Sequence, residues 1–322
     1  MSLIRAFQIA ETGGKACFSS IERQNPGPGQ VRLSIRACGL NFADLLIQNG
    51  TYQDIPAAPF TLGMEIAGEI SAIGESVQGF EPGQRVAVYA GQGGLAEEGV
   101  FDADRVIPIP DAMSFEQAAG FQVAYGTSHM ALAHRGRLQP GETLLVTGAA
   151  GGVGLTAVEI GKLMGATVIA HARGADKLKV AKAAGADHLV DDGEDLRQRL
   201  LDLGGADVVY DAVGGAAFKA AFRAMRPEGR LIAIGFASGD VPQIPANHLM
   251  VKNLDVIGFY IGGYMKFRPD AVRNSFATLM GWFEQGRLRP HISHVLPLDR
   301  VEEGMALLRD RKSTGKVVIR VS

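Results

Sequence analysis

Residues 1–125 show the hydrophobic pattern of short strands separated by turns. Apolar and polar side chains alternate over residues 31–37, the period expected of a strand with one buried face. Pro-Gly dipeptides at 28–29 and 82–83 precede strand-like runs, as turn dipeptides do. Further strands are expected at 64–72 and 85–89. This half of the chain therefore predicts an all-β unit, folded as a small barrel.

From residue 140 the pattern changes to strands that alternate with helices. The first strand-like run, at 143–147, is a continuous apolar strand, as in a parallel sheet buried on both faces. Strands are expected at 143–147, 167–170, 207–210, 231–234 and 255–260, with helices at 155–164, 177–184 and 218–225. Two more helices, at 270–285 and 299–310, precede a closing strand at 316–321. The succession predicts right-handed βαβ units and an α/β fold with a doubly wound parallel sheet.

Composition and charge narrow the class of protein. The 322 residues suit two domains. With 47% hydrophobic and 20% charged residues, the chain has the composition of a globular protein rather than a disordered one. A net charge of −2, without any block of like charge, argues against a broad nucleic-acid-binding surface.

Cysteine usage and hydropathy indicate a cytoplasmic location. Cys17 and Cys38 are too few for a disulfide framework or a four-cysteine zinc site, and both are typical of a reducing compartment. The first residues lack a basic start followed by an apolar run, so no signal peptide is expected. No window of about 20 residues is apolar enough to span a membrane.

The most informative segment is a glycine cluster between a predicted strand and a predicted helix. It reads Gly148-Ala149-Ala150-Gly151-Gly152-Val153-Gly154, with glycines spaced by three rather than starting as G-x-G. Such a turn presents bare backbone N–H groups and a helix N-terminus to a pyrophosphate. The alternative is a glycine-rich turn without a ligand, but the flanking elements and the βαβ series favour a dinucleotide. We expect cofactor contacts from Gly148, Ala150, Gly151, Gly152, Val153 and Gly154.

The residues after the second strand of this series bear on the choice between NADPH and NADH. NAD sites usually place a carboxylate at the end of that strand, where it accepts hydrogen bonds from the ribose hydroxyls. Here Arg173 and Lys177 follow instead, two cations that suit a 2′-phosphate. The alternative is that both only decorate a helix start, and Asp191 and Asp192 count against NADPH if they face the same pocket. We expect NADPH.

Three motifs together resemble a known family. Gly39-Leu40-Asn41-Phe42-Ala43-Asp44, Gly63-Met64-Glu65-Ile66-Ala67-Gly68 and the glycine cluster, in this order, resemble the quinone oxidoreductase branch of the medium-chain dehydrogenase/reductase superfamily. The resemblance implies a GroES-like β-barrel catalytic domain at 1–125, completed by 266–322, and a Rossmann NADP-binding domain at 126–265. It also implies NADPH-dependent reduction and a homodimer, in which the strand at 254–261 can pair with its two-fold mate.

The same resemblance bears on metal binding. Zinc-dependent relatives carry a Cys where this chain has Asn41 and a His where it has Met64, and Glu65 beside them holds nothing alone. A catalytic zinc needs about three protein ligands, and all seven histidines lie beyond residue 128, after the 1–125 segment that carries Asn41 and Met64. We therefore expect no metal. Without a Lewis acid, the acceptor should already be electrophilic, as a quinone or an alkene conjugated to a carbonyl is.

The resemblance also implies roles for individual side chains. Asn41 should face the nicotinamide and hold the acceptor oxygen or a ribose hydroxyl, although an Asn in a turn can be purely structural. Tyr52 borders the nicotinamide in the family and can donate a proton, with a half-buried loop aromatic as the alternative. Thr127 should lie near the carboxamide or the phosphates, unless its hydroxyl only bonds back to its own helix.

A second group of residues lies at strand ends or near the C-terminus and is expected along the cofactor. Its members are Gly235, Phe236, Phe259, Ile261 and Lys316. For each of them, plain packing or a solvated charge is the alternative. Asp44 and Asp211 are expected to be structural polar groups, and His171 either touches the adenosine phosphate or faces solvent.

The predicted function is NADPH-dependent transfer of a hydride, without metal, to a quinone. The sequence does not separate this from reduction of α,β-unsaturated carbonyls, whether enones, enals or enoyl thioesters. A third hypothesis is a redox sensor that binds NADPH but turns over little. The expected partner is a small molecule, and we expect neither nucleic acid nor membrane.

Overall fold

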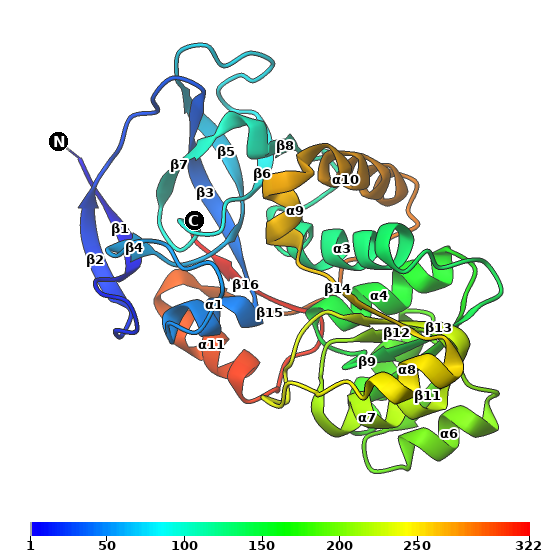
Figure 1. Cartoon of the computed structure of the whole chain (residues 1–322). Helices are drawn as coiled ribbons and strands as arrows, with labels where there is room; N and C mark the ends of the chain where they lie inside the picture. Colours follow the sequence, from blue (N-terminus) through cyan, green and yellow to red (C-terminus); the bar gives the residue numbers. More distant parts are fainter. Residues whose placement is uncertain (1) are drawn as a thin grey trace. The chain divides into compact units, whose positions relative to one another are not determined.

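The computed structural model describes residues 2–322, which divide into two compact units. The first consists of the chain up to Val123 together with Pro290–Ser322, and the second is Ala124–Arg289. Strands dominate the first unit, whereas strands and helices alternate in the second (Figure 1). The change of pattern seen along the sequence therefore coincides with a change of unit.

The first unit is built on a seven-stranded sheet with the path β15-β16-β3-β5-β6-β8, to which β7 adds by pairing with β3. A three-stranded sheet follows the order β2-β1-β4. Inward side chains of the larger sheet, among them Leu33, Ile66 and Val88, form its core. The strands are β1 (Leu3–Ile9), β2 (Cys17–Glu22), β3 (Gln30–Leu40), β4 (Phe60–Thr61), β5 (Glu65–Ile73), β6 (Arg85–Tyr89), β7 (Glu98–Asp102), β8 (Val106–Pro108), β15 (Ile292–Pro297) and β16 (Lys316–Arg320).

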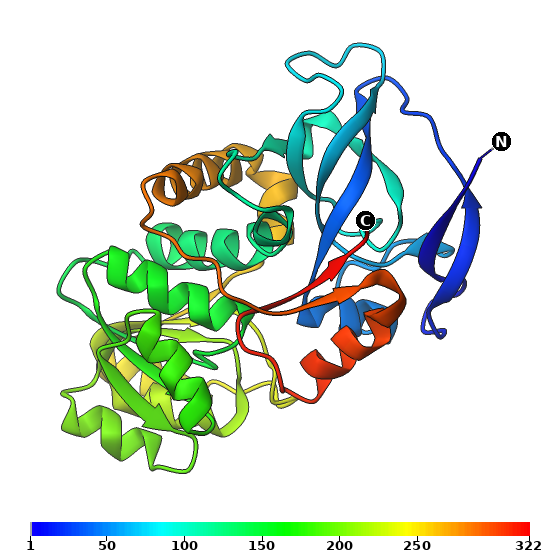
Figure 2. The same cartoon turned by 180° about the vertical axis from the view of Figure 1, so that it is seen from behind.

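The C-terminal segment completes this unit. Strand β16 runs antiparallel to β3, with Val318 opposite Gly39, and β15 pairs with the other side of β16. Figure 2 shows β16, coloured red, in the same sheet as the blue β3. The helices of the unit are α1 (Phe42–Gln48), α2 (Phe115–Ala119) and α11 (Val301–Arg309). A segment far away in the sequence thus places Lys316 beside the end of β3.

The second unit is a doubly wound parallel sheet, which confirms the predicted fold class. Its six strands follow the order β11-β10-β9-β12-β13-β14, so the chain winds outward in both directions from the β9–β12 pair. Helices α3 and α4 lie on one face and α6, α7 and α8 on the other (Figure 1). The strands are β9 (Thr143–Thr147), β10 (Thr167–Ala172), β11 (His188–Asp191), β12 (Ala206–Asp211), β13 (Met225–Ala233) and β14 (Asp255–Gly258).

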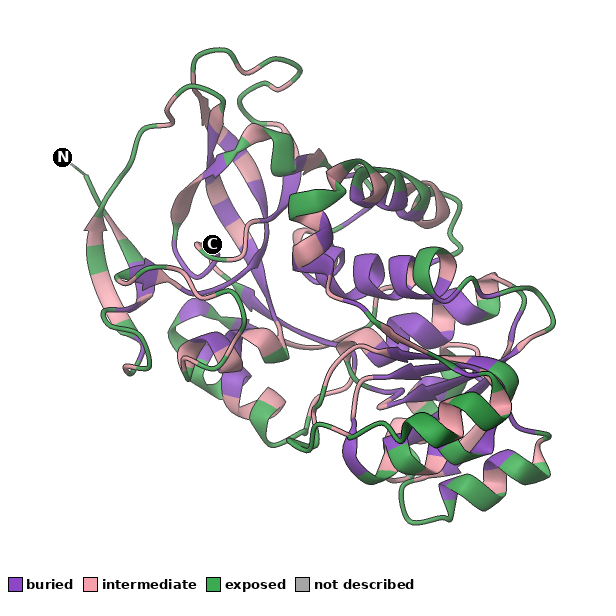
Figure 3. Ribbon diagram, in the orientation of Figure 1, coloured by how far each residue is buried: buried purple, intermediate pink, exposed green. Residues whose placement is uncertain are grey.

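Burial explains why the central strands of this unit are mainly apolar. Leu145, Ile169 and Val209 of β9, β10 and β12 are fully buried, and these central strands are mostly purple in Figure 3, while the outer helices carry exposed residues. The helices are α3 (Gln122–His129), α4 (Gly152–Leu163), α5 (Ala175–Ala183), α6 (Leu196–Asp202), α7 (Gly215–Ala224), α8 (Ala246–Lys252), α9 (Ile261–Phe267) and α10 (Pro269–Glu284). Six further residues, Met130–Arg135, continue α3 as a π-helix.

The structure differs from the sequence prediction at one domain boundary. Residues 266–289, expected to complete the barrel, lie in the second unit, because α10 packs within it. Phe276 of α10 fills the space that a Cβ at Gly126 would need, and Ser275 hydrogen-bonds the His129 ring over 2.7 Å. The predicted strand at 255–260 also ends earlier, at Gly258, since α9 begins at Ile261.

Candidate active site

The glycine cluster forms a tight turn from β9 into α4. Gly148 adopts a φ of 64°, and Gly151 is the N-cap of α4 without any side-chain cap. A Cβ at Gly154 would lie 2.1 Å from the carbonyl oxygen of Gly148, so only glycine permits this turn. The first turn of α4 carries no acidic side chain and offers its backbone N–H groups to an anion. The predicted loop therefore fits the pyrophosphate of a dinucleotide.

A buried carboxyl group braces the same edge of the sheet. Asp211 ends β12, next to β9, and accepts a hydrogen bond from the Thr147 hydroxyl. Its carboxyl oxygens also accept the backbone N–H groups of Val213 and Gly214. Burial raises the pKa of Asp211 above its usual range. These contacts fix the turns after β9 and β12, the structural role expected of Asp211.

A cluster of buried hydroxyl groups joins α3 to α4 and β12. The Ser128 hydroxyl donates to the Val153 carbonyl over 2.9 Å and lies 2.8 Å from the Thr156 hydroxyl and 3.1 Å from that of Tyr210. Burial raises the pKa of Tyr210. Thr127, the predicted cofactor contact, is buried at the neighbouring position of α3. This cluster was not predicted, although the polar residues Ser128 and Thr156 within apolar helices could have indicated it.

In the first unit, Glu65 holds together three segments that are distant in the sequence. Its Oε2 accepts the Lys316 ammonium over 2.8 Å and the Asn41 side-chain amide over 3.0 Å, while Oε1 accepts the Val123 backbone N–H over 2.9 Å. Glu65 is fully buried and Lys316 is 5% exposed. Asn41 and Lys316 were predicted from the sequence, but Glu65 had no predicted role, because its partners lie far from it along the chain, at residues 41, 123 and 316.

This network fixes the orientation of the Asn41 amide. The Lys316 ammonium donates to Oδ1 of Asn41 over 2.7 Å, and Nδ2 donates to Glu65 and to the Gly39 carbonyl oxygen. Since an ammonium can only donate and a carboxylate can only accept, the reverse orientation of the amide would lose both contacts. Both amide hydrogens are therefore engaged, and the remaining capacity of Asn41 is a lone pair on Oδ1.

Asp44 lies one helical turn away from Asn41 and is also buried. Its Oδ2 accepts the backbone N–H of Asn41 over 2.8 Å and thereby caps α1, as expected of a structural polar group. Burial raises the pKa of Asp44 to about 7, and the negative charge of Glu65 adds to this effect while Lys316 opposes it. In the described chain, its Oδ1 is buried without a hydrogen-bond partner.

Tyr52 and four residues of the second unit complete the predicted set. Tyr52 is half-buried in the loop after α1. Gly235 and Phe236 follow β13, where the Phe236 side chain is 41% exposed, and Phe259 follows β14. Ile261 begins α9 and is buried, as Phe259 is. The glycine turn, Gly235, Phe236 and Phe259 thus share the carboxyl edge of the parallel sheet, where folds of this type bind ligands.

At the predicted adenosine end of the site, positively and negatively charged side chains lie together. Arg173, after β10, pairs with Asp192, after the neighbouring β11, at 3.3 Å. His171 is buried rather than solvent-facing, and its Nε2 lies 3.5 Å from Asp192. Lys177 lies in the first turn of α5. Asp192, one of the two acidic residues that counted against NADPH, therefore lies beside Arg173, which favours it.

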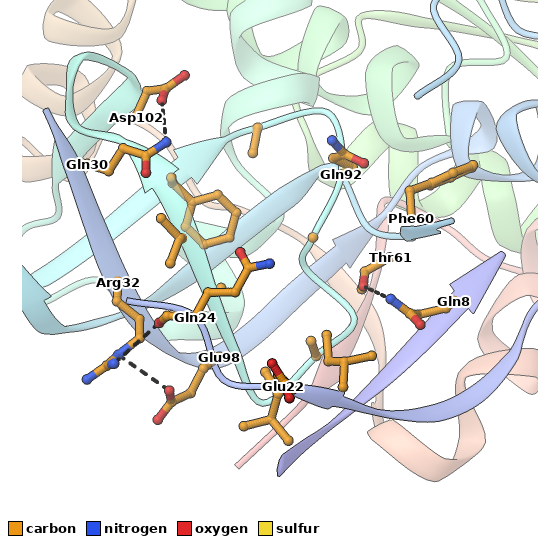
Figure 4. A pocket seen from close by; sticks show the side chains of 18 of the residues that line it. Gln8, Glu22, Gln24, Gln30, Arg32, Phe60, Thr61, Gln92, Glu98 and Asp102 are labelled. Atoms are coloured by element: carbon orange, nitrogen blue, oxygen red, sulfur yellow. Dashed lines mark hydrogen bonds and ion pairs between the residues drawn. The ribbon is translucent and has the colours of Figure 1, made fainter. Parts of the chain in front are cut away.

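A pocket of about 510 Å³ opens elsewhere in the first unit, and no predicted site residue lines it. Figure 4 shows that its polar side chains interact with one another: Arg32 with Glu98, Gln30 with Asp102, and Gln8 with Thr61. Within residues 2–322, no group of three or more His, Cys, Asp or Glu is arranged to hold a metal ion. None of the helices described combines the length and apolarity that a membrane span requires.

Comparison with known proteins shows the family. Residues 27–111 match the alcohol dehydrogenase GroES-like domain, and residues 152–283 match the zinc-binding dehydrogenase family. The chain is 42% identical to the quinone oxidoreductase-like protein 2 homolog of Nematostella vectensis, over 92% of this chain and 83% of that protein.

Two solved structures extend the comparison. The quinone oxidoreductase of Thermus thermophilus, solved alone and in complex with NADPH, is 32% identical with a TM-score of 0.87, over 98% of this chain and all of that one. The CurK enoyl reductase is 25% identical with a TM-score of 0.90, over 99% of both chains. The chain belongs to the quinone oxidoreductase branch of the medium-chain dehydrogenase/reductase superfamily.

Proposed function

We propose that this protein is an oxidoreductase that uses NADPH to reduce a quinone without the help of a metal ion. The observation that carries the proposal is the turn at Gly148–Gly154, whose packing leaves bare backbone at the N-terminus of α4. The bound dinucleotide supplies the hydride. The likeness to a quinone oxidoreductase solved with NADPH supports the choice of cofactor and acceptor.

The second unit binds and orients the cofactor in this proposal. The N–H groups at the start of α4 hold the pyrophosphate, and Arg173 and Lys177 hold the 2′-phosphate. Thr127, Gly235, Phe236, Phe259 and Ile261 line the rest of the dinucleotide. The Asp211 and Ser128 contacts keep these turns rigid, so that the reacting carbon is held in one position.

In this proposal, residues of the first unit position the acceptor and donate the proton that it needs. Because both amide hydrogens of Asn41 are engaged, we assign to its Oδ1 lone pair a ribose hydroxyl rather than the acceptor oxygen. Lys316 keeps one N–H beyond those given to Asn41 and Glu65, and we assign it to the cofactor. The Tyr52 phenol donates a hydrogen bond to the acceptor oxygen. A quinone that takes a hydride and one proton, from Tyr52 or water, leaves as the hydroquinone.

The likeness to an enoyl reductase supports a second candidate acceptor. An alkene conjugated to a carbonyl would take the hydride at its β-carbon and a proton at its α-carbon. The same residues would bind the cofactor, and Tyr52 would donate a hydrogen bond to the carbonyl oxygen or a proton to the α-carbon. A redox sensor that binds NADPH with little turnover is the third candidate.

One assay separates these candidates. Oxidation of NADPH, followed by the loss of its near-ultraviolet absorbance, is measured against a panel of quinones, enones and enoyl thioesters, before and after dialysis against a chelator. We expect quinone-dependent oxidation that survives the chelator. Turnover of enones alone would favour the second candidate, and tight NADPH binding without turnover would favour the sensor. Loss of activity on dialysis, restored by zinc, would contradict metal independence.

A matched set of variants tests the assigned residues. Tyr52→Phe removes the donor but keeps the ring, and we expect kcat to fall about tenfold to a hundredfold with little change in the KM for NADPH. Arg173→Ala should raise the KM for NADPH but not that for NADH. An unchanged ratio of the two KM values would count against the 2′-phosphate assignment.

We also propose a homodimer in the cytoplasm. Strand β14 is an edge strand of the parallel sheet, and α8 beside it in the chain exposes Met250 and Val251 to 73% and 74%. Pairing of β14 with its two-fold mate would satisfy its open edge and cover apolar surface. Cys17 and Cys38 are free thiols, which supports a reducing compartment.

A further inference from the structure

An ion pair at the adenosine end of the cofactor site joins two neighbouring strands. Asp192, directly after β11, places Oδ2 3.3 Å from Nε of Arg173, which directly follows β10. The two strands are parallel neighbours, with Ala172 opposite Asp191. A carboxylate therefore does stand at the place where β10 ends, although the sequence of β10 itself provides none.

The two adjacent carboxylates, Asp191 and Asp192, contact different kinds of group. Asp191 accepts the backbone N–H of Gly174 over 2.7 Å and that of Gly193 over 2.9 Å. These two hydrogen bonds lower the pKa of Asp191 and hold the turn after β10. Asp192, in contrast, directs its carboxylate at side chains, those of Arg173 and His171. Asp192 is therefore the carboxylate that can respond to a ligand.

His171 does not neutralise Asp192. Its side chain is 6% exposed and its Nε2 lies 3.5 Å from Oδ1 of Asp192. Burial lowers the pKa of His171, against the opposite influence of Asp192, Asp191, Asp211 and Glu194, so the ring is neutral at neutral pH. The charge on Asp192 is thus balanced by Arg173, the same side chain that a 2′-phosphate would require.

We propose that Asp192 limits the preference for NADPH and lets the site accept NADH as well. A 2′-phosphate must share Arg173 with Asp192, which already contacts its Nε, and must tolerate the negative charge of that carboxylate. An unphosphorylated ribose meets no such repulsion, and Asp192 can accept its hydroxyl hydrogen, as a carboxylate on the second strand does in NAD sites. The inference rests on the proposed function, since it concerns the same dinucleotide site.

The test measures binding of the adenosine half of each cofactor, so that it does not depend on turnover. Dissociation constants of 2′,5′-ADP and 5′-AMP are measured by calorimetry for the wild type and for Asp192→Asn. The amide keeps the shape of the side chain but removes its charge. We expect the ratio of the two affinities to shift towards 2′,5′-ADP by about fivefold to tenfold, the effect of removing one nearby like charge.

Two controls make the shift specific. Asp202→Asn also removes one negative charge, but at the C-terminal end of α6, about 10 Å from the start of that helix. It should leave the ratio of the two affinities unchanged. Arg173→Ala should weaken 2′,5′-ADP binding by about tenfold. In the double variant Arg173→Ala/Asp192→Asn, most of the gain caused by Asp192→Asn should be lost. Because Asp192 is 45% exposed, its substitution is compatible with folding, which far-ultraviolet circular dichroism checks.

The outcomes distinguish a failure of the role of Asp192 from a failure of the proposed dinucleotide site. If both fragments bind the wild type and Asp192→Asn leaves their ratio unchanged, or shifts it no more than Asp202→Asn does, the role of Asp192 is overturned while the cofactor site stands. If neither fragment binds the wild type, the proposed dinucleotide site is itself wrong, and the inference fails with it.

Discussion

At the scale of single residues, the buried ion pair of Glu65 and Lys316 joins β5 to β16 in the first unit. Lys316→Met would leave the Glu65 carboxylate buried without its cation, so we expect the free energy of unfolding to fall by about 3–5 kcal/mol. The double variant Glu65→Gln/Lys316→Met removes both charges and should be more stable than Lys316→Met alone. Urea unfolding of the three proteins measures this. A loss below about 1 kcal/mol in Lys316→Met would contradict the buried pair.

Asp44 makes a prediction about pH. Its pKa is about 7 in the folded protein, against 3.8 as the ordinary value, so the folded state binds a proton over this interval that the unfolded state has lost. Its contribution to the free energy of unfolding is therefore complete below about pH 4 and decreases by up to about 4 kcal/mol as the pH rises to 7. Above that pH it stays constant.

The substitution Asp44→Asn isolates this contribution. Asn keeps an oxygen for the Asn41 N–H but does not titrate, so the decrease between about pH 4 and pH 7 should be smaller in the variant by the amount that Asp44 contributes. Urea unfolding of both proteins at several pH values provides the comparison. Parallel curves for the two proteins would show that Asp44 titrates normally.

The sequence predicted several residues of the candidate site but not their contacts. Asn41, the glycine turn and Arg173 stood in recognisable motifs. Glu65 did not receive a role, because its three partners come from segments that only the folded sheet brings together. In the same way, Asp192 could not be paired with Arg173 until the register of β10 and β11 was known.

At the scale of elements, the turn from β9 to α4 depends on one glycine more than on the others. A Cβ at Gly154 would meet the Gly148 carbonyl oxygen at 2.1 Å, whereas a Cβ at Gly151 would lie 3.4 Å from the same atom. We expect Gly154→Ala to lower the free energy of unfolding by about 1–3 kcal/mol and to abolish measurable NADPH binding.

Gly151→Ala is the matched control for this prediction. The added methyl group has room, and the residue is exposed at the N-cap, so the free energy of unfolding should change by less than about 0.5 kcal/mol. Both variants are compared by urea unfolding and by calorimetry with NADPH. Equal losses of stability in the two variants would refute the steric argument for this turn.

Elements with a strong period were predicted well, and short ones were missed. The five strands expected in the parallel sheet all occur, because each contains a run of apolar residues, whereas the short edge strand β11 was not predicted. The short helices α6 and α8, by contrast, were not predicted, and Met250 and Val251 of α8 are exposed despite being apolar. The end of the strand expected at 255–260 was misplaced because the aromatic residues Phe259 and Tyr260 fit a strand, whereas Tyr260 is the N-cap of α9.

At the scale of the whole molecule, the proposed dimer is open to a direct measurement. Light scattering at micromolar concentration should give twice the mass of the chain. Val251→Glu, on the exposed face of α8, should shift the protein towards the monomer, whereas Leu201→Glu, exposed on α6 near the opposite edge strand β11, should not. A wild-type mass equal to that of one chain would contradict the proposed dimer.

The central claim is that the glycine turn binds a nicotinamide dinucleotide from which this chain delivers a hydride to a quinone. The most direct measurement is the oxidation of NADPH by the purified protein with a quinone as the second substrate, compared with Gly154→Ala under the same conditions. The account predicts stoichiometric loss of NADPH and formation of hydroquinone in the wild type, and neither in the variant. Calorimetry that detects no binding of NADPH or NADH to the wild type would contradict it.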